Sequence, residues 1–427
     1  MTAPAIPPPV SAARHAERLR AARDQLAALG SGALLVGVGA DLRWLTGYAA
    51  MPLERLTLLV VPVSGPPALL VPRLEVGPAL LAPAVAAGAV QVLSWEETED
   101  PFARVPALVG ALPGDGTLGA SPARSRRTAG ASAARSGRTL GASPAGGRRA
   151  AGARPARLLV SDRLPAAFLL QLQATFPEAR FGLASAALRE LRMVKDAEEV
   201  ALLRAAAGAA DRVVAAIARG RLVGRSELEV AREVRERLVD EGHETASFSI
   251  VGCGPNSASP HHAASARRIG PGEPIVLDIG GTLGGYGSDV TRTLWVTGGD
   301  PARGPDAEFR ALYGVLQAAQ AAAAAAARPG VSCEQVDRVA RDAIASAGHG
   351  PHFIHRTGHG IGLEEHEDPY LVQGNRESLR AGYAFSVEPG IYLEGRYGAR
   401  IEDIVVCGPQ EPELLNRAPR ELLVVDG

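Results

Sequence analysis

The segment that decides the fold is EPIVLDIGGTLGGYGSDVTRTLWV, residues 273–296. Two apolar runs flank the glycine-rich stretch GGTLGG, a pattern that predicts a β-hairpin. Asp278 and Asp289 lie at equal distances from residues 283 and 284, the centre of the expected turn. Regular pairing would place the two carboxylates opposite each other, with Cβ atoms roughly 5 Å apart, where like charges destabilise a sheet. A cation held between them would remove this repulsion.

The same arrangement recurs in FSVEPGIYLEGRYGARIEDIVV, residues 385–406. Glu388 and Glu402 are symmetric about Gly395, so this hairpin also predicts a cross-strand carboxylate pair between apolar strands. Two such pairs indicate a metal site. Four carboxylates and an imidazole suit two divalent ions such as Mn, Co or Zn better than one structural zinc. Two ions about 3.5–4 Å apart would hold a water between them and lower its pKa.

The imidazole is expected from HFIHRTGHGIGLEEHEDP, residues 352–369, because eight of the nine histidines lie between residues 243 and 366. His355 and His359 are four residues apart, as in the zinc motif H-E-x-x-H. The intervening glutamate is absent, however, and the glycines that flank His359 disfavour the helix that this motif requires. We therefore expect His359 to act as a ligand from a loop or strand, with His366 reaching the same cleft.

The rest of the chain divides into two parts by pattern. Helical spacing over residues 11–29 and aliphatic runs at 33–39, 56–63 and 156–162 predict a small α/β domain over residues 1–186. The following residues, 187–427, combine hairpins with helix patterns at 190–220, 226–242, 305–328 and 333–348. Helices and antiparallel hairpins within one unit predict an α+β fold class.

Three 11-residue units and a shorter fourth fill residues 117–157, which contain nine arginines and no acidic residue. Alanine, glycine, serine, proline and arginine dominate these units, and such residues bury too little apolar surface to offset the entropy of ordering them. We expect a disordered surface loop. An arginine-rich patch for anionic partners is the alternative, weakened by the absence of aromatic residues that would stack on bases. The formal net charge of the whole chain, −1, also argues against nucleic-acid binding.

Three cysteines, at positions 253, 333 and 407, are odd in number and widely spaced, so no disulfide framework is expected. The first 30 residues lack the apolar core of a signal peptide, and no run approaches the roughly 20 apolar residues of a membrane span. We expect a soluble cytoplasmic protein.

From about residue 187 to 425 the chain resembles the pita-bread metallopeptidases of family M24, the group of Xaa-Pro aminopeptidases, prolidases and methionine aminopeptidases. The matching segments are SASPHH (257–262), VLDIGG (276–281), GSDVTRT (287–293), HRTGHGIGLEEHEDP (355–369), SVEPGIY (386–392) and GARIEDIVV (398–406). The upstream region, with DLRWLTGY (41–48), resembles the creatinase/prolidase-type N-terminal domain of Xaa-Pro enzymes. The resemblance covers nearly the whole chain except the 11-residue repeats.

The resemblance implies a role for each candidate residue. The implied metal ligands are Asp278, Asp289, His359, Glu388 and Glu402, of which Asp289 and Glu402 would bridge two ions, Asp278 would bind one ion, and His359 and Glu388 the other. Its implied catalytic residues are Glu388 as proton shuttle, His261 and His366 as hydrogen-bond donors to the scissile carbonyl or the intermediate, and His355 in the cleft wall. Arg400 would pair with a ligand carboxylate.

The activity implied by the resemblance is that of an exopeptidase with two divalent ions, most plausibly manganese, which cleaves the Xaa-Pro bond at the N-terminus of peptides. An Xaa-Pro dipeptidase (prolidase) is the alternative. Tyr370 stands where dipeptide-specific members can carry an arginine for the substrate carboxylate, which favours the aminopeptidase; Glu365 replaces a usual aliphatic residue. A creatinase-like metal-free C–N hydrolase would lack several ligand carboxylates, and a non-catalytic binding module of this fold is a third possibility. A homodimer is also implied.

Overall fold

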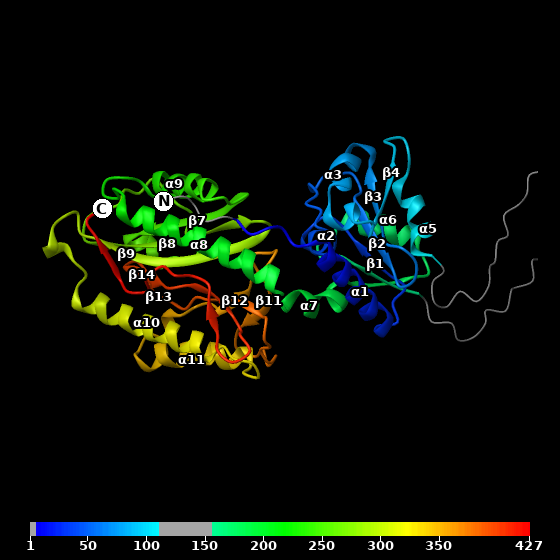
Figure 1. Cartoon of the computed structure of the whole chain (residues 1–427). Coiled ribbons are helices and arrows are strands. Elements are labelled where there is room, and N and C mark those ends of the chain that lie inside the picture. The colour runs from blue at the N-terminus through cyan, green and yellow to red at the C-terminus, as the bar shows by residue number, and fades with distance from the viewer. Residues whose placement is uncertain (1–5, 111–155) are drawn as a thin grey trace, which may run out of the picture.

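The chain forms an N-terminal unit around one mixed sheet and a larger C-terminal unit in which helices cover sheets of five, four and two strands, the two units lying side by side (Figure 1). This computed structural model describes residues 6–110 and 156–427. All but the last two residues of the arginine-rich insert, 117–157, lie outside the described residues, so its expected disorder is not addressed. The expected α+β class is confirmed.

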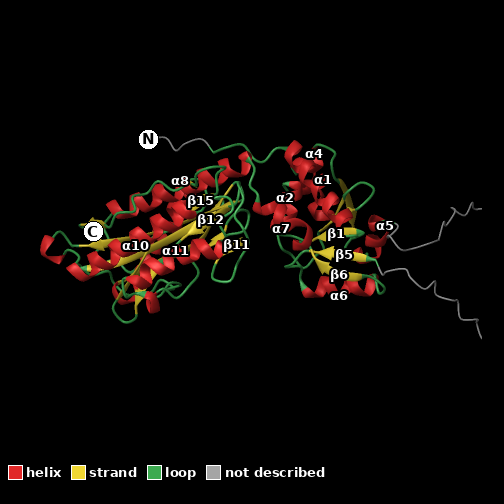
Figure 2. Cartoon of the chain, turned by 90° about the horizontal axis from the view of Figure 1, so that it is seen from below, coloured by secondary structure: helices red, strands yellow, loops and turns green. Residues whose placement is uncertain are grey.

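A six-stranded sheet of order β4-β3-β2-β1-β5-β6 organises the N-terminal unit. Its helices and strands are α1 (Ala12–Ala28), β1 (Ala33–Val36), α2 (Ala40–Thr46), β2 (Leu58–Pro62), β3 (Ala68–Pro72), α3 (Val76–Leu80), α4 (Pro83–Ala86), β4 (Gln91–Trp95), α5 (Val105–Val109), β5 (Arg157–Val160), α6 (Ala166–Thr175), β6 (Arg180–Leu183) and α7 (Ser185–Met193). β1, β5 and β6 run parallel, whereas β1, β2 and β3 pair antiparallel. Apolar clusters cover both faces of the sheet, as expected for a layer with helices on each side (Figure 2).

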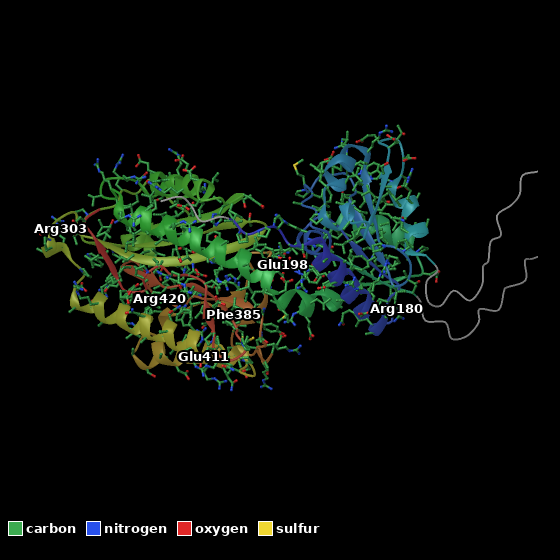
Figure 3. All side chains as sticks on the ribbon, viewed as in Figure 1. Arg180, Glu198, Arg303, Phe385, Glu411 and Arg420 are labelled. Carbon is green, nitrogen blue, oxygen red and sulfur yellow. The ribbon has the colours of Figure 1, made fainter. Side chains whose placement is uncertain are left out.

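The C-terminal unit consists of two layers that meet at its centre, and each layer is formed by strands with a pair of helices packed on them. Its elements are α8 (Ala197–Arg219), α9 (Glu227–Asp240), β7 (Thr245–Cys253), β8 (Glu273–Leu283), β9 (Tyr286–Val296), α10 (Ala307–Ala326), α11 (Cys333–Ser346), β10 (Gly358–Gly360), β11 (Glu367–Leu371), β12 (Ala384–Val387), β13 (Gly390–Leu393), β14 (Tyr397–Arg400), β15 (Asp403–Val406), β16 (Glu413–Leu414) and β17 (Leu423–Val425). Helices α8 and α9 cover the sheet β17-β9-β8-β7, and α10 and α11 pack on the opposite side of the unit (Figure 1). Fully buried Phe385 of β12 belongs to the core beneath α10 and α11 (Figure 3).

The single helix predicted over residues 190–220 is wrong, because the structure divides it into α7 and α8. Asp196 caps α8: its side chain accepts the Glu199 N–H, and the Glu199 side chain accepts the Asp196 N–H. This reciprocal pair is a capping box, and the pattern D-x-x-E was present in the sequence as a start signal. Between the helices, Lys195 donates its N–H to the Gly382 carbonyl of the C-terminal unit. The proposed domain division at residues 186 and 187 lies within α7, just before this break.

Ion pairs join the two units next to the break. Arg18 of α1 pairs with Asp196 and Glu199 at the start of α8, and Arg43 of α2 pairs with Glu244. Glu198, in the first turn of α8, accepts the Ser11 N–H at 2.7 Å and lies at the end of α8 that faces the N-terminal unit (Figure 3). These contacts hold the N-terminal unit beside one end of the C-terminal unit.

Candidate metal centre

The hairpin of β8 and β9 brings two candidate carboxylates to one face. Its turn is the pair Gly284 and Gly285, both with positive φ (58° and 87°), which a two-residue hairpin turn requires. This turn sets the register Asp278↔Thr291 and Gly280↔Asp289. The predicted direct opposition of Asp278 and Asp289 is therefore wrong, because the turn centre lies one residue further along the chain. Residues two apart still share a face, so the two carboxylates are diagonal neighbours.

The second carboxylate pair has the register that its sequence predicts. Val387 of β12 pairs with Asp403 of β15, and Gly390 of β13 pairs with Arg400 of β14. Glu388 and Glu402 lie between these two pairs of strands and therefore face each other. The Glu388 N–H donates to the Thr357 carbonyl at 2.8 Å, and the Glu402 N–H donates to the Thr291 carbonyl of β9 at 3.1 Å. The hydrogen bond between Glu402 and Thr291 joins the two layers, so the four carboxylates converge where the sheets meet.

His359 completes the cluster from strand β10, as expected of a ligand outside a helix. A side chain at Gly358 would collide with the Ser386 carbonyl, which explains the glycine beside this histidine. His359 Nδ1 lies 3.1 Å from the Gly360 carbonyl, which can only accept, so Nδ1 carries the proton. Its Nε2 is then an unprotonated acceptor that faces Glu388 Oε1 at 3.3 Å and Asp289 Oδ2 at 3.6 Å. Three acceptors that face one another are unfavourable unless a proton or a metal cation lies among them.

Potential ligand atoms within 4.8 Å of one another form three overlapping groups. These groups are Asp278 with Asp289 and Glu402, His359 with Glu388 and Glu402, and Asp289 with His359 and His366. Asp289, Glu402 and His359 each belong to two groups, and the two carboxylates among them have the two oxygen atoms needed to face two ions. The structure thus brings all five expected ligands together and adds His366 at the edge.

Burial makes this cluster electrostatically unfavourable without metal. It is the largest cause of the raised pKa of Asp289, ahead of the charges of Glu402 and Asp278. The pKa of Glu402 is raised for the same reasons, by burial and then by Glu388. Burial also raises the pKa of Glu388 to about 7, against the opposing charge of Arg400. Burial, together with His366, lowers the pKa of His359 to about 3, so this imidazole is neutral and able to bind a metal.

The donor set fits divalent ions. Asp278 Oδ1 and Glu402 Oε1 are buried and have no hydrogen-bond partner among the described residues. A buried carboxylate oxygen without a partner is strongly unfavourable, and a metal ion bound there would satisfy both atoms. Four carboxylates and one imidazole are ligands that Mn and Zn accept.

Neighbouring side chains orient the ligands. Thr291 Oγ1 donates to Glu402 Oε2 at 2.7 Å and accepts from Arg400 Nε at 3.1 Å. Buried Arg400 also forms an ion pair with Asp278, the kind of contact expected of it. Ser386 Oγ accepts the His359 N–H at 3.0 Å and donates to Glu388 Oε1 at 3.1 Å. Such contacts fix ligand geometry, and removing one typically weakens metal binding by roughly 10–100-fold.

The structure separates the two adjacent histidines 261 and 262. His261 lines the cleft of the carboxylate cluster, as expected. His262 instead places Nε2 2.8 Å from Glu227 Oε2. Glu227 is fully buried and also accepts hydrogen bonds from the Cys253 N–H, Asn256 and Ser265. Burial alone would raise the pKa of Glu227, but these hydrogen bonds lower it to about 2, so an ionised carboxylate holds the loop that presents His261.

His355 and His366 line the same cleft but differ in the hydrogen bonds of their ring nitrogens. His355 Nδ1 lies 2.8 Å from the Arg356 carbonyl and must donate, so Nε2 accepts the Tyr392 hydroxyl at 2.9 Å. Both nitrogens of His355 are therefore engaged. The His366 ring lies 3.8 Å from the His359 ring, and its Nδ1 accepts from Arg356 at 3.2 Å. The neutral ring then carries its proton on Nε2, which is free to donate into the cleft.

Two cavities surround these residues. The cleft of the carboxylate cluster has a volume of about 580 Å³ and also contains Arg356 and Glu365. A second cavity of about 370 Å³ lies between the units, where the ends of β1 and β5 face residues 363–370. His366 lines both cavities, so the N-terminal unit closes one side of the space next to the cluster.

Sequence reasoning did not identify Thr291, Ser386, Tyr392, Glu227 or Arg356 as contributors. Thr291, Ser386 and Tyr392 lie within the quoted segments, two to four residues from a candidate ligand, and their proximity was the available signal. Glu227 lies at the start of α9, and its partners are 26 to 38 residues away along the chain. No local pattern marks such a contact.

Metal binding is expected to release protons near neutral pH. The raised pKa values of Asp289, Glu402 and Glu388 mean that the metal-free folded protein binds protons that a divalent ion must displace. Affinity for Mn²⁺ should therefore increase as pH rises from about 6 to about 8. Calorimetric titration in buffers of different ionisation enthalpy measures the protons released; an affinity independent of pH, with no protons released, would contradict the burial of these carboxylates.

Comparison with known proteins gives consistent matches. Residues 201–409 match metallopeptidase family M24, and residues 18–127 match the creatinase/prolidase N-terminal domain. The probable dipeptidase PepE of Mycobacterium tuberculosis is 41% identical over 412 residues, 96% of either chain. The crystal structure of dipeptidase PepE from Mycobacterium ulcerans is 41% identical with a TM-score of 0.81, covering 98% of this chain and 100% of that one. A prolidase from Thermococcus sibiricus is 30% identical with a TM-score of 0.79, covering 96% and 98%.

Proposed function

This chain belongs to metallopeptidase family M24, and from that premise we propose that it is a dipeptidase that cleaves Xaa-Pro dipeptides with two divalent metal ions. Membership of the pita-bread metallopeptidases, expected from the quoted segments, is confirmed, and the protein is a peptidase. The names of its relatives support the dipeptidase alternative over the aminopeptidase, within the same family. The observation that carries the proposal is the cluster of four carboxylates and a neutral imidazole, with two buried oxygens that lack a partner.

The proposed ligands are those that converge in the cleft: Asp278, Asp289, His359, Glu388 and Glu402. When bound, the ions supply Lewis-acid activation of water and of the scissile carbonyl. Glu388 would accept a proton from the attacking water and deliver it to the leaving nitrogen.

The histidines of the cleft would stabilise the reacting carbonyl. His366 carries a proton on Nε2 and is close to His359, so we assign it the hydrogen bond to the oxygen that gains negative charge. His261 would donate from the opposite loop. His355 has no free nitrogen, so we assign it to the cleft wall, where it positions Tyr392 beside Arg400.

Three further properties remain proposals. Manganese is the proposed ion, on the strength of the carboxylate-rich donor set. A homodimer is proposed from the family resemblance alone. A cytoplasmic location is proposed because the three cysteines are free and buried, which suits a reducing compartment. Among the described residues, no helix is long and apolar enough to cross a membrane.

The test is peptide hydrolysis by protein that has been chelated and then reloaded separately with Mn, Co or Zn. Ala-Pro should be hydrolysed only after metal is restored, and Ala-Pro-Ala should react at least about tenfold more slowly in kcat/KM, one decade being about 1.4 kcal/mol of discrimination. Ala-Ala serves as the control for proline preference. Equal rates on the dipeptide and the tripeptide would indicate the aminopeptidase. No turnover with two ions bound per chain would refute the assignment to Xaa-Pro bonds.

A further inference from the structure

Five arginines line the cleft and the neighbouring cavity, and one of them differs from the rest. Arg163, Arg189, Arg192 and Arg400 each form an ion pair with at least one carboxylate. Arg356 forms none with any carboxylate of the described ranges, 6–110 and 156–427. Glu365, which also lines the cleft, is not an ion-pair partner of this guanidinium. A half-buried cation without an anion is available to a ligand.

The position of this guanidinium is fixed by two contacts. Its central carbon lies 4.5 Å from the centre of the Tyr370 ring, a stacking arrangement that holds the planar group at low entropic cost. Its Nη2 lies 3.2 Å from His366 Nδ1. Only some of the five N–H groups of an arginine are used in this way, so the remaining donors can receive another partner.

Charge balance in the cleft favours an anionic ligand. Two divalent ions would neutralise the four carboxylates of the cluster, so the field that those carboxylates exert on Arg356 would largely disappear once metal binds. The group of a peptide substrate that is always anionic at neutral pH is its C-terminal carboxylate. Arginine binds carboxylates through two parallel N–H···O bonds, which gives both affinity and orientation.

The contacts of Arg356 place it close to the carboxylate cluster. One imidazole separates Arg356 from the cluster, because His366 contacts this arginine on one side and lies 3.8 Å from the His359 ring on the other. In a dipeptide, one residue separates the scissile carbonyl from the terminal carboxylate. Consecutive α-carbons are about 3.8 Å apart, and a hydrogen bond at the end adds roughly 3 Å. A longer peptide would place its carboxylate beyond this arginine.

We propose that Arg356, held on the ring of Tyr370, binds the C-terminal carboxylate of the substrate and thereby selects dipeptides. The proposal rests on the proposed dipeptidase function and specifies its substrate. It also explains Tyr370, which lacks the positive charge expected there of a dipeptide-specific enzyme: in this chain the tyrosine supports an arginine that comes from residue 356.

The test compares Ala-Pro with Ala-Pro amide, which has the same scissile bond and no terminal carboxylate, on Mn-loaded protein. Wild type should favour the free acid by roughly 10–100-fold in kcat/KM, the range of a charge-assisted bidentate contact. Arg356→Gln should lower this ratio to about 1, chiefly through a higher KM for the acid, and Arg356→Lys should retain part of it. Arg163→Gln is the matched control, since Arg163 is 79% exposed and pairs with Glu364 in the neighbouring cavity.

Two results would overturn the proposal. The first is that Arg356→Gln retains the preference for the free acid. The second is that it lowers activity on acid and amide equally, which would reveal a structural role through His366. Titration of metal-loaded protein with free proline, followed by calorimetry, provides a readout without turnover: binding should weaken at least about tenfold in Arg356→Gln. If wild type cleaves neither substrate, the dipeptidase function fails, and the proline titration still decides whether Arg356 binds carboxylates.

Discussion

Replacing Asp289 with asparagine is expected to make the metal-free protein more stable while abolishing hydrolysis. The carboxylate of Asp289 is buried against Glu402, Asp278 and Glu388, and these neighbours raise its pKa. A raised carboxyl pKa means that the ionised group destabilises the folded state at neutral pH. Removing the charge should therefore raise the Tm of the metal-free protein.

Activity should change in the opposite direction. Asp289 is one of two carboxylates that belong to two ligand groups, so under the proposed ligand set its loss would remove a contact to both ions. We expect kcat/KM to fall at least about 10³-fold, because several kcal/mol of transition-state stabilisation come from the metal site. Thermal unfolding with and without Mn²⁺, together with peptide hydrolysis, measures both effects. Exposed Asp24 of α1 provides the matched control, Asp24→Asn; a destabilised metal-free Asp289→Asn would show that the carboxylate has a cation partner in the protein itself.

Replacing Arg400 with methionine is expected to cause a large loss of stability that metal partly restores. Arg400 is buried, and although burial would lower its pKa, the charges of Tyr392, Asp278 and Glu388 raise it. Breaking a buried ion pair by removing one partner typically lowers stability by about 3–5 kcal/mol. Metal ions neutralise the same carboxylates, so Mn²⁺ should restore part of the loss.

The control for this substitution is another buried arginine. Arg292 is fully buried and pairs with Asp403, which also accepts hydrogen bonds from Gln320 and Arg420. Arg292→Met should lose comparable stability without additional rescue by metal. Urea unfolding of both variants with and without Mn²⁺ provides the comparison. Equal rescue in the two variants would mean that Arg400 does not balance the carboxylate cluster.

Local patterns were sufficient to predict that the four candidate carboxylates lie together. Carboxylates placed symmetrically about a glycine-rich turn lie on one sheet face even when the register differs by two residues, as it does for Asp278 and Asp289. The turn itself decided that register: Gly284 and Gly285 both adopt positive φ, so the tight turn forms there and not one residue earlier. Symmetry about Gly395 gave the register of the second pair directly.

Other features depend on contacts between distant residues. The break between α7 and α8 is stabilised by Lys195, whose N–H bonds to Gly382, and only the capping pattern at Asp196 marked it locally. Strands β4 and β6 lie at the edges of the sheet and bury few of their side chains, so their sequence patterns were weak. The proposed role of Arg356 depends on Tyr370, which lies 14 residues further along the chain. Tertiary packing, which no single segment encodes, creates these arrangements.

Anomalous diffraction from crystals loaded with Mn²⁺ would test the central claim most directly. The account predicts two anomalous peaks about 3.5–4 Å apart, with Asp289 and Glu402 in contact with both and His359 in contact with one. A single peak, or ions bound away from these carboxylates, would contradict it.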